Sequence, residues 1–227
     1  MLKTNQMKKI LILLFIAITG SQLFAQDTLQ RFEIAVNPAF NYRFFSTKNE
    51  ELNWLKNEQD SLQKGSAGFG VQINHEFGIS EQRSFFMGIA YNKQGYSYNE
   101  QAINGFISYA LNYHFLQFPV GANFYFRTNE QFQFCLQPSF IPGTLLKSTA
   151  VYQEVNAYER QKTSIYPSSS SITLHAQLAA GVLVKLDPVW KLRAQLFAMQ
   201  QVTSVSKGDL ACRLFSAGIQ LAIARDL

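Results

Sequence analysis

The stretch RFEIAVNPAFNYRF (Arg31–Phe44) decides the fold. Apolar or aromatic residues occupy its even positions: Phe32, Ile34, Val36, Pro38, Phe40, Tyr42 and Phe44. Polar, charged or small residues occupy its odd positions: Arg31, Glu33, Ala35, Asn37, Ala39, Asn41 and Arg43. Successive side chains of a β-strand point to opposite faces, so this stretch predicts a strand with one apolar and one polar face.

The same alternation recurs along the rest of the chain. It is found in seven further segments: 67–79, 84–97, 113–126, 131–141, 171–186, 189–203 and 210–224. Residues 113–126, for example, set Leu116 and Phe118 against Gln117 and Gly121. The sequence therefore predicts eight strands and an all-β fold.

The expected connections differ in length in a regular way. Short turns at 80–83, 127–130 and 187–188 alternate with longer connections at 46–66, 98–112, 142–170 and 204–209. Short turns at one end and long loops at the other are typical of barrels that span an outer membrane. We therefore expect an eight-stranded antiparallel up-and-down transmembrane β-barrel, with both termini on the periplasmic side beside the short turns.

The composition indicates which face meets lipid. A soluble lipocalin-like barrel would turn its apolar face inward and carry many charges outside. Here only 15% of residues are charged, against about 25% in an average soluble domain, and 14% are aromatic. The mean hydropathy of −0.06 then reflects an apolar face toward lipid averaged with polar residues that line a filled lumen. Six aromatic residues near the short turns are expected to form a periplasmic girdle: Phe32, Phe77, Phe85, Phe126, Phe132 and Trp190.

Residues 1–25 have the order of a secretory signal peptide. Lys3, Lys8 and Lys9 precede a short apolar run (ILILLFIAI), and SQLFA ends at Ala25. The run is about half the length that a membrane helix needs. Removal of the three lysines leaves 17 basic and 15 acidic residues, a net charge of +2 instead of +5, with no basic stripe for nucleic acid. We expect residues 26–227 to form the barrel.

One group of charged side chains shares the lumen-facing phase near the short turns. Its members are Arg31, Glu33, Glu76, Lys185, Lys191 and Arg193. An eight-stranded barrel is just wide enough for side chains to fill it. We expect these residues to form a salt-bridged plug, and the alternative is a narrow gated path through the lumen.

The histidines and cysteines do not predict a reactive site. His75, His114 and His175 lie on separate strands, and a metal needs converging ligands, so we expect no metal and no cofactor. Cys135 and Cys212 are expected at different heights of the barrel, too far apart for a disulfide.

The segment around His114 holds a Ser–His pair and a change in the alternation of apolar residues. Ser108 lies on the same segment, but no acidic residue is clearly placed to orient the imidazole, so no catalytic residue is predicted. The apolar phase changes at His114 from odd positions (Tyr113, Phe115) to even positions (Leu116, Phe118). A β-bulge is expected there.

The segment NYHFLQFPVGANFYF (Asn112–Phe126) resembles the central strand of a known family. This is the outer-membrane β-barrel domain family of Gram-negative bacteria that includes the PorT-like proteins. In that family a Tyr-Leu-Glu-Ile-Pro-like stretch precedes alternating apolar residues. Here FLQFP stands at those places, with Gln117 where an acidic residue is usual, and the closing segment LFSAGIQLAIARDL is also similar. The resemblance implies a fold and a place in the bacterial outer membrane. It does not imply a chemical activity.

The functional expectation follows from these predictions. We expect a non-enzymatic barrel surrounded by outer-membrane lipid, with a structural or interaction role and a possible protein partner at loops 46–66 and 142–170, since long loops are frequent binding sites. Two alternatives remain: a porin-like pore for small solutes, and a lipid-modifying outer-membrane enzyme.

Overall fold

The computed structural model describes residues 30–227 apart from 48–50, 52, 55–56, 58–62, 103–104, 128, 130, 155–160, 166–171 and 205–209. The signal peptide predicted at 1–25 lies outside the described residues. Within the described ranges, no helix has both the length and the apolar character needed to cross a membrane.

Ten strands make up a single sheet in which every pairing is antiparallel. They are β1 (Gln30–Thr47), β2 (Gln63–Ser80), β3 (Arg83–Ala102), β4 (Gly105–Gln117), β5 (Val120–Arg127), β6 (Phe132–Glu154), β7 (Gln161–Ile165), β8 (Ile172–Lys185), β9 (Trp190–Gln201) and β10 (Leu210–Asp226).

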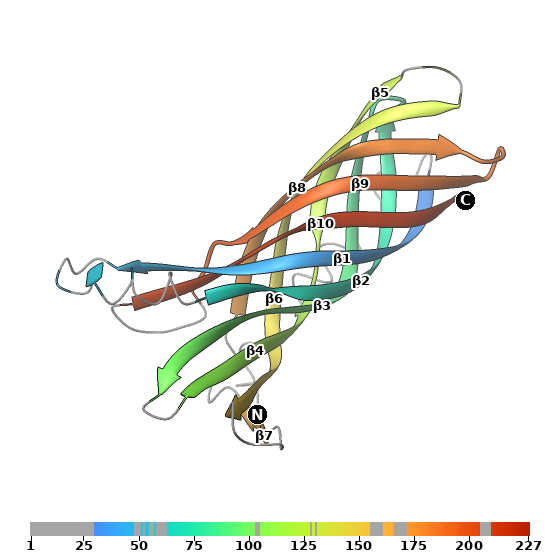
Figure 1. Cartoon of the computed structure of the whole chain (residues 1–227). Coiled ribbons are helices and arrows are strands. Elements are labelled where there is room, and N and C mark those ends of the chain that lie inside the picture. Colours follow the sequence, from blue (N-terminus) through green and yellow to red (C-terminus); the bar gives the residue numbers. More distant parts are fainter. Residues whose placement is uncertain are drawn as a thin grey trace, which may run out of the picture.

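The sheet closes on itself (Figure 1). Strand β1 pairs with β2 on one side and with β10 on the other, so the first and last strands meet. Strands β4 and β5 share one place between β3 and β6. They are separated only at Phe118 and Pro119, because proline has no backbone N–H to donate to the ladder. The ring therefore has eight places, and the predicted eight-stranded up-and-down barrel is confirmed.

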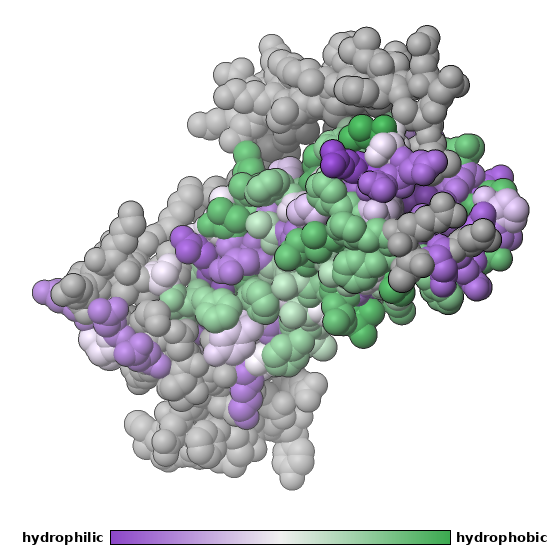
Figure 2. Space-filling model, turned by 90° about the horizontal axis from the view of Figure 1, so that it is seen from above, coloured by the Kyte–Doolittle hydropathy of each residue, from purple (hydrophilic) through white to green (hydrophobic). Residues whose placement is uncertain are grey.

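The alternation of the sequence corresponds to the two faces of the barrel wall, one toward the lumen and one toward the outside. Along β1, Arg31 and Glu33 are buried, whereas Phe32 and Ile34 between them are 41% and 45% exposed. The same pattern continues around the barrel, and a hydrophobic band covers the middle of the outer face seen in Figure 2. A soluble barrel would bury these apolar side chains, so the observed orientation is that of a barrel whose outer face meets lipid.

The three short turns lie where they were predicted, at the end of the barrel that also holds Gln30 and the C-terminus (Figure 1). Three of the predicted loops are wrong in extent. Residues expected in the 98–112 connection belong to β3 and β4, and Tyr98 lies opposite Tyr109. In the expected 142–170 loop, β6 continues to Glu154 and β7 pairs with it, and the 46–66 segment begins and ends in strand.

The loop predictions failed for a physical reason. A strand shows alternating apolar residues only where its outer face contacts lipid. Where a strand extends past the membrane, its outer face needs no apolar residues, so the alternation no longer identifies it. Strand β6 also carries an irregularity, because His114 pairs with Lys147 whereas Phe115 pairs with Leu145, which leaves Leu146 as an extra residue. This insertion shifts the alternation by one position and hides the continuing strand from a period-two pattern.

The interior at the long-loop end is aromatic, which corrects the expectation of a polar lumen throughout. Tyr96, Tyr113, Phe115, Leu145 and Leu214 form a buried cluster there. Burial in β4 stays on the odd positions Tyr113, Phe115 and Gln117, so the strand does not change phase at His114. The bulge expected in the strand of His114 is therefore not found in β4; the pairing does shift at His114, but the extra residue belongs to β6.

Candidate functional site

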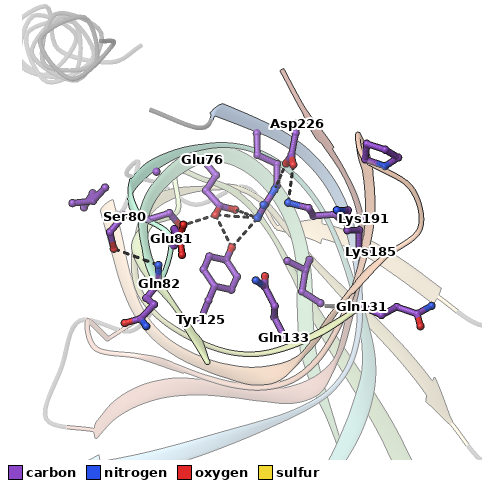
Figure 3. A pocket seen from close by; sticks show the side chains of 16 residues that line it. Glu76, Ser80, Glu81, Gln82, Tyr125, Gln131, Gln133, Lys185, Lys191 and Asp226 are labelled. Atoms are coloured by element: carbon purple, nitrogen blue, oxygen red, sulfur yellow. Dashed lines mark hydrogen bonds and ion pairs between the residues drawn. The ribbon is translucent and has the colours of Figure 1, made fainter. Parts of the chain in front are cut away.

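A cavity of about 530 Å³ lies at the short-turn end of the lumen (Figure 3). The short turns and the starts and ends of the strands line it: Arg31, Glu76, Gly78–Gln82, Ser84, Tyr125, Gln131, Gln133, Leu183, Lys185, Pro188, Lys191 and Asp226. Among the described residues, the ion pairs all lie at or next to this cavity, which makes it the candidate site.

The Glu76 carboxylate is the centre of the charged group. Both of its oxygens accept bonds from Arg31 Nη1, at 3.2 and 3.3 Å, and Arg193 Nη2 lies 2.9 Å from Oε2. The hydroxyls of Ser84 and Tyr125 donate to Oε1 at 2.6 and 2.5 Å. Glu76 is 3% exposed, so its negative charge is balanced almost entirely by protein donors.

A second carboxylate completes the inner part of the group. Arg193 Nη1 lies 3.1 Å from Glu33 Oε2, while Asn74 donates to Glu33 Oε1 at 3.0 Å. The Tyr125 hydroxyl accepts from both Arg31 and Arg193, at 3.0 and 2.7 Å. The two guanidinium groups are therefore joined through the same carboxylate and the same phenol.

The outer part of the group lies closer to water. Asp226 near the end of β10 accepts from Arg31 Nε at 2.7 Å through one oxygen and from Lys191 Nζ at 2.7 Å through the other. The side chains of Lys191 and Asp226 are 14% exposed, against 1–4% for the inner charges. The group thus extends from the buried lumen to the cavity.

The structure brings together five of the six residues predicted for the lumen charge cluster. Ion pairs join Arg31, Glu33, Glu76, Lys191 and Arg193 to one another, directly or through Asp226. Lys185 lines the cavity but is exposed and takes part in none of these ion pairs. Lys185 is the last residue of β8, and its side chain is exposed there.

Sequence reasoning missed four members of the group: Tyr125, Asp226, Asn74 and Ser84. Each has the inward phase of its own strand, for instance Tyr125 two residues after the buried Asn123. A polar residue in that phase close to a short turn was the available signal.

The charges of the group balance. Three cations (Arg31, Lys191, Arg193) meet three anions (Glu33, Glu76, Asp226). Buried charges are tolerated when each has a partner of opposite sign, and within this group Arg193 Nε is a buried donor without a hydrogen-bond partner. Side chains from β1, β2, β5 and β9 reach one another across the lumen, so the group links the barrel wall from several sides.

A second cluster fills the lumen at the other end. The Arg43 guanidinium lies 3.9 Å from the ring centroid of Phe45 and 3.9 Å from that of Tyr96. Tyr98 and Tyr109 stack above it with centroids 4.7 Å apart. These contacts join the buried aromatic cluster of β3 and β4, so both ends of the lumen contain packed side chains.

The six residues predicted for the periplasmic girdle all have the outward phase near the short turns. Phe32, Phe126, Phe132 and Trp190 are 38–54% exposed. Phe77 and Phe85 are partly buried, lie directly opposite each other in the β2–β3 pair, and Arg225 packs over the Trp190 ring.

The histidines are dispersed. His175 is buried in the lumen against Phe115, whereas His75 and His114 lie on the outer face beside Phe77 and Tyr91. Among the described residues, no three His, Cys, Asp or Glu side chains converge as metal ligands would. Cys135 and Cys212 are both buried and are not joined by a disulfide, as predicted.

The closed sheet and the apolar outer face define a small transmembrane β-barrel. Residues 24–198 match the family model described as outer membrane protein beta-barrel domain, and the chain belongs to this family. Its place is therefore the bacterial outer membrane. No curated protein sequence matches the chain.

Solved structures with a similar chain path include Neisserial surface protein A (12% identity, TM-score 0.43, 86% of this chain and 97% of that one). Another is Ail of Yersinia pestis (13%, 0.34, 85% and 97%). A third is the outer membrane protease OmpT of Escherichia coli (7%, 0.44, 90% and 98%).

Proposed function

We propose that this outer-membrane barrel is non-enzymatic, that its lumen is closed, and that it acts through protein contacts at its long-loop end. The observation that carries the proposal is the buried group in which Arg31 and Arg193, from two different strands, both form ion pairs with Glu76 of a third strand inside the barrel. Ions crossing the lumen would have to displace this charge-balanced group, which is costly because each charge would lose its partners.

The aromatic cluster at the other end supports the same proposal. Arg43 between Phe45 and Tyr96 closes the interior by stacking rather than by ion pairs. Opening a continuous path would require both clusters to rearrange, and packed interiors resist such changes.

We infer that the termini and the short turns face the periplasm. The support is the outward ring of Phe32, Phe126, Phe132 and Trp190 at that end, since aromatic residues gather at membrane interfaces. At the other end, strands project past the membrane: β3 has 20 residues and β6 has 23, whereas about 9–11 residues suffice to span it. Those projecting strands and the 46–66 and 142–170 segments are the proposed contact region for a protein partner.

The closed lumen is tested by conductance. The purified full chain, inserted into planar lipid bilayers beside a known porin as a positive control for insertion, should give no steady open-channel current. Sustained single-channel steps that scale with the number of inserted molecules would instead support the porin-like alternative. Unchanged lipid A mass spectra in a strain that lacks the protein are expected, and a changed acyl or headgroup pattern would favour the lipid-modifying alternative.

The orientation is tested by thiol labelling on intact cells. Cys135 and Cys212 are buried, so an added cysteine dominates the signal. A membrane-impermeant maleimide should label Ser97→Cys at the long-loop end and should not label Glu81→Cys in a short turn. The reverse pattern would place the termini outside the cell.

A further inference from the structure

Three basic side chains form a row across the outer face of three neighbouring strands. Lys93 of β3 lies directly opposite His114 of β4, and His114 lies directly opposite Lys147 of β6. Directly opposite residues share one face of a sheet, and neighbouring strands are about 4.8 Å apart. We call Lys93, His114 and Lys147 the basic row.

The β-bulge creates this row. In a regular ladder, His114 would lie opposite Leu146, and Lys147 would share the inward phase of Tyr113. The extra residue shifts the pairing, so that Lys147 lies opposite His114 and has its outward phase. Bulges commonly re-aim a side chain in this way. Without the bulge, a lysine would point toward the buried aromatic cluster.

The row lies at the boundary of the apolar band. Below it on β3, Ile89 and Tyr91 are 46% and 40% exposed on the lipid side. Lys93 is ten residues from the first residue of β3, Arg83, which is about the length of a membrane-spanning strand. The side chains therefore leave the hydrocarbon region where lipid headgroups begin.

The chemistry of the row suits an anion. Among the described residues, the ion pairs involve neither Lys93 nor Lys147, and both lysines are partly exposed. The Tyr91 hydroxyl lies 2.5 Å from His114 Nδ1. If that hydroxyl donates the bond, the imidazole proton is on Nε2, and the ring is held as a donor between two ammonium groups.

We propose that the basic row binds the phosphate groups of a membrane lipid headgroup. With the orientation inferred under the proposed function, this headgroup belongs to the outer leaflet and is that of a phosphorylated glycolipid, lipid A. Lysine binds phosphate as a point charge, and three donors in a row offer one headgroup several charge-assisted bonds. The site would fix the barrel in its surrounding lipid at the long-loop end.

Native mass spectrometry of the purified full chain in detergent, with lipid A added, tests the proposal. The double variant Lys93→Gln/Lys147→Gln should bind lipid A about tenfold more weakly than the wild type, because two charge-assisted contacts are lost. The variant Lys93→Arg/Lys147→Arg should keep most of the binding. Dephosphorylated lipid A should bind the wild type no better than it binds the double glutamine variant.

The matched control is Arg83→Gln/Arg225→Gln, which removes two exposed cations at the opposite end of the barrel. It should bind lipid A as the wild type does. Equal binding by the Lys93→Gln/Lys147→Gln variant and this control overturns the proposal, and so does equal binding of phosphorylated and dephosphorylated lipid. Tight binding of phosphatidylglycerol with none of lipid A would assign the row to a phospholipid instead. A heat-induced band shift on gels verifies that each variant is folded, and none of these results depends on whether the lumen conducts.

Discussion

Arg193 of β9 and Glu76 of β2 are 117 residues apart in the sequence, and their side chains meet inside the barrel with Nη2 2.9 Å from Oε2. Neither strand pairs with the other, since β1 and β10 lie between them on one side of the ring. The contact therefore exists only when the barrel has closed. The ion-pair group is therefore a measure of complete folding.

Glu76→Gln is expected to be among the most destabilising single substitutions of the barrel. The glutamine keeps the volume, but Arg31 and Arg193 lose the carboxylate that they share in a buried site. Removing one partner of a buried pair costs about 3–5 kcal/mol. Urea unfolding of the refolded protein in detergent should show this loss, whereas Glu81→Gln, in an exposed turn, should change the free energy of unfolding little. Similar values for both variants would show that Glu76 contributes no more than a surface charge.

Tyr125→Phe isolates the hydroxyl that links the two guanidinium groups. It leaves the ring in place but removes the donor to Glu76 and the acceptor for Arg31 and Arg193. Hydrogen bonds to charged groups contribute about 1.5–3 kcal/mol. The same unfolding assay should report a loss in this range, while Tyr42→Phe, whose ring packs against Phe44, serves as the control. No difference between the two variants would mean that the arginines find equivalent partners without the phenol.

The strands could be predicted because the chain has different surroundings on its two faces. In the part of the barrel that spans the membrane, Phe32 and Ile34 face lipid while Arg31 and Glu33 face the lumen. This difference between the two faces produces the alternation of apolar and polar residues in the sequence. At the long-loop end the contrast disappears. Tyr98 and Tyr109 look like loop residues in the sequence, although they stack across a paired hairpin.

The sequence allowed most of the charged residues of the group to be predicted, but not which of them contact one another. Phase and height were enough to select Arg31, Glu76 and Arg193. Which residues touch depends on the stagger between strands, and this is set by pairings across the whole ring. For that reason Asp226 and Tyr125 were missed, and Lys185 was included although it lies at the exposed end of its strand.

The two thiols should behave as isolated, protected groups. Cys135 has no exposed surface and Cys212 is 6% exposed. In the folded barrel, a maleimide reagent should add slowly to either one. After unfolding in urea without a reductant, intact-mass measurement should find two adducts, since no disulfide joins them. A non-reducing peptide map that contains a Cys135–Cys212 linkage would contradict this prediction.

Asp187, in the turn between β8 and β9, should give the barrel a small pH-dependent stability. Its Oδ1 accepts from the backbone N–H groups of Val189 and Trp190, both at 2.7 Å. These bonds, that of Trp190 most, hold the pKa of the Asp187 carboxyl below its ordinary value. A lowered pKa means that the stabilisation is fully present above the ordinary pKa of aspartate, about 4, and is lost as the pH falls through the lowered pKa.

The variant Asp187→Asn keeps an oxygen acceptor but does not titrate, so it isolates this effect. At neutral pH the wild type should have the higher urea midpoint, and the difference between the two proteins should shrink as the pH falls through the lowered pKa of Asp187. Other carboxylates titrate in both proteins and cancel in the comparison. A difference that stays constant from neutral to acidic pH would show that the turn depends on the shape of the Asp187 side chain and not on its charge.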